Sequence, residues 1–364
     1  MGMKEFLQNK ERLVGSSKMQ IETQMFSQEV DFEMFEKKFW GKNKGKLKLS
    51  ALNIWTEIYS VIKGGISAIH NTKYNYYEDI ISWEAYKKME SPMEDSISLD
   101  EKHRIYLLYM KYEKWKKKHY YYDFMDVVRH VFKFYPHWKA HNIEYLVVDE
   151  VQDLAPLTIQ LLLTATKQNV FFCGDTAQTI AKGVTFRFYD LKPVFINQSY
   201  TRNINEISKD KLKSLEPKVI QLTRNYRSHN NILQLANSVV DIIELYFPHT
   251  IDKLQRESSE LDGPKPIVLE GFTIDDLEKL MMYSSKSTTP KFGCNQVIIV
   301  RNQETKAQLP IFLKKALCLT VYEAKGLEFD DVILYDFFTE SPCKGQWRII
   351  NDIEVYTGKF ILHS

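Results

Sequence analysis

A chain of 364 residues is long enough for roughly two or three domains, each with its own hydrophobic core. Apolar residues make up 44% of the chain and charged residues 26%, and this ordinary globular usage excludes a collagen-like or wholly disordered protein. The 49 basic and 47 acidic side chains leave a formal charge of +2, so a surface that binds a polyanion has to be local.

Cysteine usage and hydropathy bear on the compartment. The 4 cysteines include no C-x-x-C pair, which argues against a disulfide framework or a cysteine zinc site and fits a reducing environment. No run of roughly 18 apolar residues occurs, and the first residues lack the apolar core of a signal peptide. We therefore expect a soluble intracellular protein with no membrane span, located in the nucleus or the cytoplasm.

Residues 1–140 have a helical texture and are rich in Lys, Glu, Tyr and Trp. Apolar side chains recur there at helical spacing in two sets, Ile54, Ile58, Ile62 and Leu107, Met110, Trp115. This pattern predicts a mostly helical region with few strands.

After residue 141, short apolar runs alternate with amphipathic stretches. The runs are 143–148, 170–173, 219–222, 267–269, 297–300 and 332–335. A helical pattern extends from Ile232 to Ile243, with Ser228 as the candidate N-cap residue. Strands that alternate with helices predict an α/β fold in which helices cover both faces of a parallel sheet. Ligands of such sheets bind at the carboxyl ends of the strands, so the residues there are the candidates for chemistry.

The first run ends in two adjacent carboxylates, Asp149 and Glu150. Asp149 can hold Mg²⁺, and Glu150 can orient or deprotonate a water that attacks a γ-phosphate, the Walker-B logic of P-loop ATPases. The alternative is a solubilising acidic strand end before a helix, because Asp153 suits a helix N-terminus. These residue types alone leave both interpretations open.

The next two runs are also followed by residues suited to a nucleotide. Gly174 and Asp175 follow the run 170–173, and the neutral amide of Gln178 can sense a phosphate or a water without competing for Mg²⁺. After the run 219–222, Tyr226 offers an aromatic face for a base, and Arg227 offers a cation for charge on a transferring phosphoryl group. The alternatives are a structural turn and an ordinary helix start with a surface arginine.

A Lys-Gly step precedes the last run. Lys325 places a cation beside the permissive backbone of Gly326, which suits the phosphate oxygens of a nucleotide or a nucleic acid. Such a step is common and carries little weight alone. The functional argument rests on the order of four signals, each at the end of or just before a predicted strand.

In this order the segments resemble the motifs of superfamily 1 helicases of the UvrD/Rep type, which are P-loop NTPases. Residues 149–153 are similar to motif II, 174–178 to motif III, 225–228 to motif IV, 320–329 to motif V, 122–126 to the D-F-x-D segment upstream of motif II, and 297–303 to a strand-plus-Arg segment. The sequence around Trp55 and Gly174 resembles in particular that of the UvrD-like module of large tetratricopeptide-and-ankyrin-repeat proteins. The resemblance implies a helical insertion-like region over 1–140 and two incomplete RecA-like lobes, 141–224 and 225–364, with parallel sheets flanked by helices.

The resemblance also implies ATP and Mg²⁺ as cofactors and a role for each matching residue. In the first lobe it implies Mg²⁺ binding by Asp149, water activation by Glu150 and γ-phosphate sensing by Gln178. In the second lobe it implies adenine stacking on Tyr226, γ-phosphate contact from Arg227, ribose contact from Glu328 and a nucleotide contact from Lys325 and Gly326. Tyr322 stands where the family usually has His and would lie near the nucleic-acid surface. We expect the first-lobe and second-lobe residues to converge on one triphosphate.

Three features of the family pattern are absent from the 364 residues. No G-x-x-x-x-G-K-[ST] phosphate-binding loop occurs, and the nearest stretch, 41–47, has its glycines one residue too close and ends in Leu47. We interpret that stretch as a solvated basic loop. The final arginine motif, expected after residue 335, is also missing, and relatives carry a large extra domain where 19 residues separate Arg301 from Thr320. We therefore expect a segment of a larger motor, completed by N-terminal and C-terminal segments of the same protein.

Residues 101–140 form a local basic region, with ten Lys and Arg against four Asp and Glu. Trp115, Lys117 and Lys118 are the candidates for contact with single-stranded nucleic acid, because cations follow phosphates while aromatic faces stack on bases. The alternative is a charged helix face over 111–118 whose aromatic side chains turn toward a core.

Two functions from different classes are therefore open. The first is the ATP-binding part of a UvrD-like DNA or RNA helicase or translocase that couples Mg-ATP hydrolysis to nucleic-acid movement, the isolated chain being inactive. The second is a non-enzymatic nucleotide-binding, nucleic-acid-binding or scaffold module of a repeat protein. The carboxylates, Gln178 and Arg227 favour the first, and the missing phosphate loop favours the second.

Overall fold

The computed structural model describes residues 28–45, 47, 49–65, 81–89, 91, 97–134, 143–195, 217–248, 250–269, 271, 275–276, 279, 296–339, 341 and 345. The chain divides into two compact units. The first unit comprises Met1–Arg224 and Leu233–Ser258, and the second comprises Asn225–Ile232 and Ser259–Ser364. The predicted domain boundaries at 140 and 224 stay a prediction.

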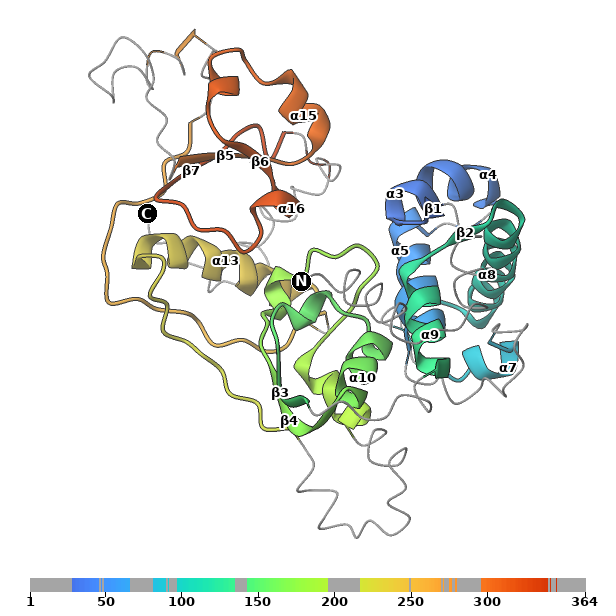
Figure 1. The fold of residues 1–364 in the computed structure, drawn as a ribbon. Helices are drawn as coiled ribbons and strands as arrows, with labels where there is room; N and C mark the ends of the chain where they lie inside the picture. Colours follow the sequence, from blue (N-terminus) through green and yellow to red (C-terminus); the bar gives the residue numbers. More distant parts are fainter. Residues whose placement is uncertain are drawn as a thin grey trace. The chain divides into compact units, whose positions relative to one another are not determined.

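The N-terminal part of the first unit is helical, as predicted. Its elements are β1 (Gln28–Glu29), α3 (Phe32–Met34), η1 (Phe35–Trp40), α4 (Gly41–Asn43), α5 (Ala51–Thr56), η2 (Glu57–Lys63), α7 (Trp83–Tyr86), α8 (Leu99–His119), β2 (Tyr121–Tyr122) and α9 (Phe124–Phe134). The two short strands pair in parallel. The segments η1 and η2 are π-helical, and η2 continues α5 without a break (Figure 1).

Local sequence signals explain where α8 begins and ends. The Ser98 side chain accepts a hydrogen bond from the Glu101 backbone, and the Glu101 carboxylate accepts one from the Ser98 backbone in return. The helix ends at Tyr120, which adopts a left-handed conformation with φ 59°. Basic side chains fill its last turn, where they complement the negative end of the helix dipole.

The core of this helical part contains the predicted set Ile54, Ile58 and Ile62, each fully buried. The set Leu107, Met110 and Trp115 lies on α8, as its helical spacing predicted; Leu107 is 48% exposed, whereas Met110 and Trp115 pack partly buried against this core. The buried residues of α8 are Lys102, Ile105, Leu108, Tyr109, Tyr112 and Lys116.

The C-terminal part of the first unit holds a parallel pair of strands, β3 (Ile143–Val148) and β4 (Thr166–Phe172). Helix α10 (Pro156–Thr164) connects them, and the short 3-10 turns η5 (Val151–Asp153), η6 (Thr176–Gln178) and η7 (Phe188–Asp190) follow the strands (Figure 1). Pro156 at the first position of α10 has the fixed φ that a helix start requires. Val151, Ile159, Leu163 and Phe186 form the core under the sheet.

Helix α13 (Asn230–Tyr246) confirms the predicted amphipathic helix. It begins at Asn230, so Ser228 is not its N-cap residue and that prediction is wrong by one position. The segment 219–222 is not a strand, which corrects another prediction. Its side chains Val219, Ile220 and Leu222 are exposed, and an apolar run forms a strand only where a second strand accepts its backbone hydrogen bonds.

The second unit contains a three-stranded parallel sheet in the order β6-β5-β7. Its elements are β5 (Gln296–Val300), α15 (Gln303–Gln308), η8 (Leu313–Lys315), β6 (Cys318–Thr320), α16 (Val321–Ala324) and β7 (Asp331–Leu334). β5 lies between the other two strands (Figure 1), and its residues Val297, Ile298 and Val300 are buried. β5 and β7 confirm two predicted runs, β6 was not predicted, and the predicted strand at 267–269 is not formed.

The parallel sheets β3-β4 and β6-β5-β7, with their connecting helices, confirm the predicted α/β class. In the described part of the chain, every helix is too short or too polar to cross a bilayer.

Candidate functional site

Asp149 and Glu150 lie where β3 ends, as the sequence predicts. Glu150 adopts a left-handed conformation with φ 54°, which costs a non-glycine residue about 1–2 kcal/mol. One oxygen of the exposed Asp149 carboxylate accepts a hydrogen bond from the Glu150 backbone at 2.9 Å. Strained backbone of this kind persists only where the surrounding structure holds the residue in place, and it is concentrated at functional sites.

Gln152 connects this strand end to the next one, and the sequence did not single it out. Its side chain is fully buried, and its amide nitrogen donates a hydrogen bond to the Glu150 carboxylate. Its amide oxygen accepts from the Asp175 backbone at 3.2 Å. One side chain therefore positions Glu150 relative to the turn that carries Gln178. The only signal for Gln152 in the sequence was its position, two residues after Glu150 and directly before Asp153.

The turn after β4 holds Gln178 beside Asp175. The Asp175 carboxylate accepts from the Ala177 backbone at 2.9 Å and from the Gln178 side-chain amide at 2.7 Å. Gln178 is exposed, and Thr176 between them is buried. The structure thus brings Glu150 and Gln178 into one hydrogen-bonded arrangement, through Gln152 and Asp175.

Asp153 fixes the loop that follows Gln178. Its carboxylate accepts hydrogen bonds from the backbones of Ile180 and Ala181, both at 3.3 Å. A helix N-terminus was the alternative interpretation for Asp153; in the structure this residue ends η5, and its carboxylate joins that segment to the loop after η6. The carboxylates of Asp149, Glu150 and Asp153 therefore have different hydrogen-bond partners.

In the second unit, the motif IV segment forms a turn around Asn225. The Asn225 side-chain oxygen accepts from the backbones of Arg227 and Ser228, both at 2.8 Å. This turn exposes Tyr226, 77% of whose surface is accessible, and its stacking on adenine stays a prediction. Arg227 forms an ion pair with Glu328 at 2.7 Å between Nε and Oε1, and both side chains are about 60% exposed (62% and 60%).

The motif V segment begins at a capped helix. Thr320 caps α16, and the Glu323 carboxylate accepts from the Thr320 backbone at 2.8 Å and from Lys306 at 2.9 Å. The Thr320 backbone hydrogen bond, followed by the Lys306 contact, lowers the pKa of Glu323 to about 2. Tyr322, a residue of α16, is 52% exposed.

The Lys325-Gly326 step follows α16. Gly326 has φ 78°, and a Cβ built there meets nothing within 4 Å, so the step borders open space. The structure therefore places Tyr226, Arg227, Lys325, Gly326 and Glu328 in the second unit, while Asp149, Glu150 and Gln178 belong to the first. Their convergence on one triphosphate stays a prediction.

Nucleic-acid candidates lie on α8 and have different environments. Lys117 and Lys118 are exposed. Trp115 is half-buried, and its ring centroid lies 5.3 Å from that of Phe39 and 5.2 Å from that of Tyr121. Its ring thus turns toward the core, the alternative that the sequence left open, and its contact with nucleic acid stays a prediction.

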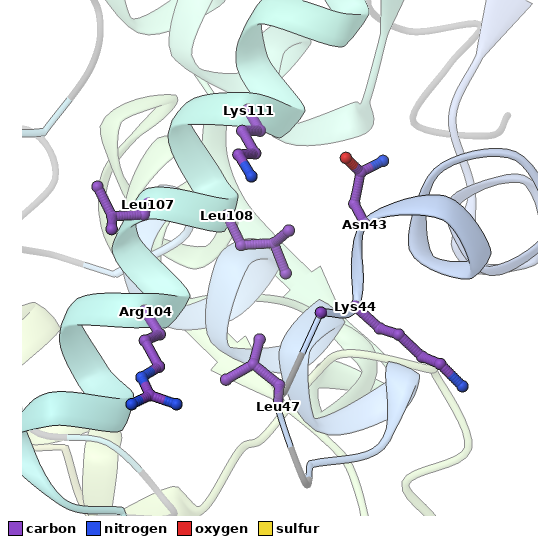
Figure 2. A pocket seen from close by; sticks show the side chains of 8 residues that line it. Asn43, Lys44, Leu47, Arg104, Leu107, Leu108 and Lys111 are labelled. Atoms are coloured by element: carbon purple, nitrogen blue, oxygen red, sulfur yellow. The ribbon is translucent and has the colours of Figure 1, made fainter.

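The local basic excess of residues 101–140 is not all on the surface. Lys102 is buried and donates to the Met89 carbonyl at 2.6 Å, and Lys116 is buried against Asp123 at 2.7 Å. A shallow pocket of about 180 Å³ does lie on α8, and Figure 2 shows Leu47 and Leu108 directed toward one another within it. Its lining residues are Asn43, Lys44, Gly45, Leu47, Arg104, Leu107, Leu108 and Lys111. The stretch 41–47 was predicted to be a solvated basic loop, but its residues 41–43 form the helix α4, and Asn43, Lys44, Gly45 and Leu47 line this pocket beside α8.

A buried charge cluster lies in the D-F-x-D segment. Lys63 is 1% exposed, and its ammonium lies 2.6 Å from Asp123 and 3.0 Å from Glu113, and contacts Asp126. Lys116 contacts the same three carboxylates. Burial alone lowers the pKa of Lys63, but the charges of Asp123, Asp126 and Glu113 outweigh it and raise the pKa well above its ordinary value. The three carboxylates therefore bind two ammonium groups, which explains their burial without a metal ion.

Paired carboxylates lie at the end of a parallel strand and are joined to a Gly-Asp turn that carries a glutamine, the arrangement expected of a helicase-family module. The family model of the UvrD/REP helicase N-terminal domain matches residues 4–187, and the chain belongs to this family. This match confirms the resemblance that the motifs predicted.

Two curated relatives extend this finding. The chain is 38% identical over 332 residues to "TPR and ankyrin repeat-containing protein 1" of Homo sapiens, covering 88% of this chain and 11% of that protein. It is 27% identical over 212 residues to "Probable DNA helicase" of Mycoplasma pneumoniae, covering 54% of this chain and 36% of that protein. The chain thus spans only about a tenth to a third of the length of these relatives.

Proposed function

We propose that this chain is the ATP-binding part of a UvrD-like DNA or RNA helicase or translocase, which couples Mg-ATP hydrolysis to movement along nucleic acid. The observation that carries the proposal is the Gln152 side chain, which joins the Glu150 carboxylate to the Asp175 turn that holds Gln178. A general base and a phosphate sensor need this fixed relation, because catalysis depends on preorganised geometry.

The donor set fits a magnesium nucleotide. Asp149 is an exposed carboxylate at a strand end, and carboxylate oxygens are the ligands that Mg²⁺ prefers. When bound, Mg²⁺ would neutralise charge on the phosphate oxygens. Tyr226 would stack on adenine, and Lys325, Gly326 and Glu328 would contact the rest of the nucleotide.

Each of the chain's own residues would then have a separate role in ATP hydrolysis. Glu150 would accept a proton on its carboxylate from the attacking water, while its left-handed backbone and the Gln152 amide keep that carboxylate in position. Gln178 would contact the γ-phosphate or the water, and Arg227 would meet charge on the transferring phosphoryl group. In the structure Arg227 is paired with Glu328, so the arginine would exchange this exposed carboxylate for a phosphate.

Nucleic acid is the proposed second ligand. Lys117 and Lys118 are exposed on α8, and Lys44, Arg104 and Lys111 surround the pocket on the same helix. We assign these cations, with Trp115 and Tyr322, to contacts with a single strand, in which cations follow the phosphates. Binding measurements with a DNA strand and with an RNA strand would decide which of the two the chain prefers.

Titration of a fluorescent ATP analogue with and without Mg²⁺ tests the nucleotide proposal. Asp149→Asn should remove the Mg²⁺ dependence, whereas Glu150→Gln should bind the nucleotide with little change. Glu144→Gln is the matched control, because Glu144 is an exposed carboxylate on β3 away from the strand end. Binding that does not respond to Mg²⁺ or to Asp149→Asn would refute the proposal.

A second function has one observation in its favour. The 364 residues contain no G-x-x-x-x-G-K-[ST] loop, which supports a non-enzymatic nucleotide-binding, nucleic-acid-binding or scaffold module of a repeat protein. Both functions predict that the purified chain has no nucleic-acid-stimulated ATP turnover above that of Glu150→Gln. Stimulated turnover by the unaltered chain would contradict the need for that loop.

A further inference from the structure

Helix α5 and its continuation η2 contact the loop that follows Gln178, although 127 residues separate the partners. The Trp55 indole nitrogen donates a hydrogen bond to the Lys182 carbonyl at 3.1 Å. The Ser60 hydroxyl donates to the next carbonyl, that of Gly183, and both partners in this second bond are buried or nearly so. Two consecutive carbonyls of one loop are therefore bound by one helix.

The loop accepts this contact only with glycine at position 183. Gly183 has φ 91°, and a Cβ built there would lie 2.3 Å from Cδ1 of the Trp55 ring and 2.5 Å from its Nε1. Carbon atoms do not approach this closely, so the indole occupies the space that any side chain would need. The Lys182 ammonium lies 4.9 Å from the ring centroid of Phe32, which attaches the loop to α3 as well.

Gln178 thus lies between two anchors. Asp175 binds its side chain on one side, and four and five residues later the Trp55 and Ser60 contacts fix the chain on the other. Asp153 holds the intervening backbone at Ile180 and Ala181. A segment of five residues spans at most about 17 Å, so the position of α5 limits where Gln178 can reach.

The other end of the helix is anchored too. The Gly64 carbonyl, directly after η2, accepts from the Leu157 backbone at 2.8 Å, at the start of α10. Lys63, the last residue of η2, enters the buried charge cluster with Asp123 and Asp126. The helix from Ala51 to Lys63 is therefore held at both ends. Its attachments fix the position of the side chains that contact the loop 179–183.

We propose that Trp55 is a positioning residue for Gln178, because its indole N–H and ring hold the loop 179–183 and so determine where the Gln178 amide meets the γ-phosphate. The inference rests on the proposed nucleotide function and deepens it. It assigns to the helical part of the first unit a role in recognising the terminal phosphate.

The test compares Trp55→Phe combined with Ser60→Ala against the unaltered chain. This variant keeps an aromatic ring in the core but removes both donors to the loop. Hydrogen exchange of amides 179–184, measured without nucleotide, should become about tenfold faster, the size expected for two lost hydrogen bonds. Trp83→Phe is the matched control, because Trp83 packs against Tyr86 and Tyr106 in the same helical part. Exchange in α8 and α10 and the midpoint of thermal unfolding report on whether the variant is folded.

The second measurement separates positioning from packing. Affinities for Mg²⁺ with AMP-PNP and for Mg²⁺ with ADP are determined for the same variants. The double variant should lose about fivefold of its preference for the triphosphate, because only that ligand reaches Gln178. A merely structural contact would alter both affinities alike.

Four results would overturn the inference. Unchanged exchange at 179–184 would show that the helix does not hold the loop, and faster exchange with an unchanged triphosphate preference would show that the loop does not position Gln178. If the unaltered chain binds neither nucleotide, the proposed function fails and the role at Gln178 fails with it. Nucleotide binding by the unaltered chain that the variant leaves unchanged refutes the role of Trp55 alone.

Discussion

The side-chain oxygen of Gln152 occupies the space that a side chain at Gly174 would need. A Cβ built on Gly174 would lie 2.3 Å from Oε1 of Gln152 and 3.1 Å from Cγ1 of Val151. The glycine at the end of β4 is therefore required by close approach rather than by an unusual φ. It lets the buried amide reach the Asp175 backbone and hold Glu150 at the same time.

Gln152→Leu should reveal this link. Leucine has a similar volume but leaves the Glu150 carboxylate and the Asp175 N–H without their amide partner, so we expect a loss of about 2–4 kcal/mol in the free energy of unfolding. Gln160→Leu is the control, since Gln160 is equally buried and its Oε1 has no partner among the described residues. The control should change stability by less than about 1 kcal/mol. Urea unfolding measures both, and equal losses would contradict a special role for Gln152.

Gly183→Ala should destabilise the first unit. The substitution combines the strain of a positive φ with a clash against the Trp55 ring, and we expect a loss of about 2–4 kcal/mol in unfolding free energy. Gly45→Ala shares the positive φ, at 55°, but its Cβ would approach an atom no closer than 3.9 Å. Gly45→Ala should therefore cost only the backbone strain, about 1–2 kcal/mol. A loss at Gly183 no larger than at Gly45 would show that the clash is relieved by local movement.

Lys63→Met should be among the more damaging substitutions in the helical part. It leaves three carboxylates with Lys116 as their only ammonium within the cluster, and removing one partner of a buried pair costs about 3–5 kcal/mol. Lys37→Met is the control, because the Lys37–Glu33 pair is exposed and 3.7 Å long. Such a pair contributes about 0–1 kcal/mol. Thermal unfolding at pH 7 measures both variants.

The same cluster sets a pH window. Burial raises the pKa of Asp126, but Lys116 and Lys63 outweigh this and lower the pKa well below its usual 3.8. A lowered carboxyl pKa contributes stability that is complete above the unfolded value and lost as the pH falls, so unfolding free energy should decline below about pH 4. The raised pKa values of Lys63 and Lys116 have the opposite sign, and their contribution is complete below 10.5 and lost as the pH rises beyond it. Lys63→Met should reduce the loss of unfolding free energy at both acidic and alkaline pH. If both losses stay unchanged, the buried charge cluster is not their cause.

Arg227→Ala should affect the nucleotide far more than the fold. Its ion pair with Glu328 is exposed and contributes little to stability, so the unfolding midpoint should stay nearly constant. Affinity for Mg²⁺ with AMP-PNP should fall about tenfold, because a charge-assisted hydrogen bond is lost. Arg256→Ala, which breaks an exposed pair with Asp241, is the control. Combining Arg227→Ala with Glu150→Gln in a double-mutant cycle tests whether both residues act on one nucleotide, and strict additivity would argue against it.

Charge reversal of Lys117 and Lys118 to glutamate should weaken binding of an oligothymidylate. Loss of two phosphate contacts should reduce the slope of log affinity against log salt by about 1.4. Lys87 and Lys88 are adjacent exposed lysines outside α8, and their reversal should leave the slope unchanged. Equal effects of the two pairs would indicate nonspecific attraction.

The order of the elements was predictable from the sequence by itself. Apolar runs of the right length predicted β3, β5 and β7, and a 3.6-residue period predicted α13. Asp149, Glu150 and Gln178 were found as candidates because they come after predicted strands, and ligands of parallel sheets bind at the carboxyl ends of the strands. These features depend on local composition, which the linear sequence contains.

Only the tertiary structure decided which residues meet across long separations. The runs 219–222 and 267–269 have strand composition, yet they form no strand because pairing needs a neighbour that composition does not specify. The bridge from Gln152 to Asp175 spans 23 residues and the contact of Trp55 with Lys182 spans 127. Hydrogen bonds and close packing of this kind depend on distance in space, so a buried glutamine and a glycine without room for a side chain become functional candidates only in the folded chain.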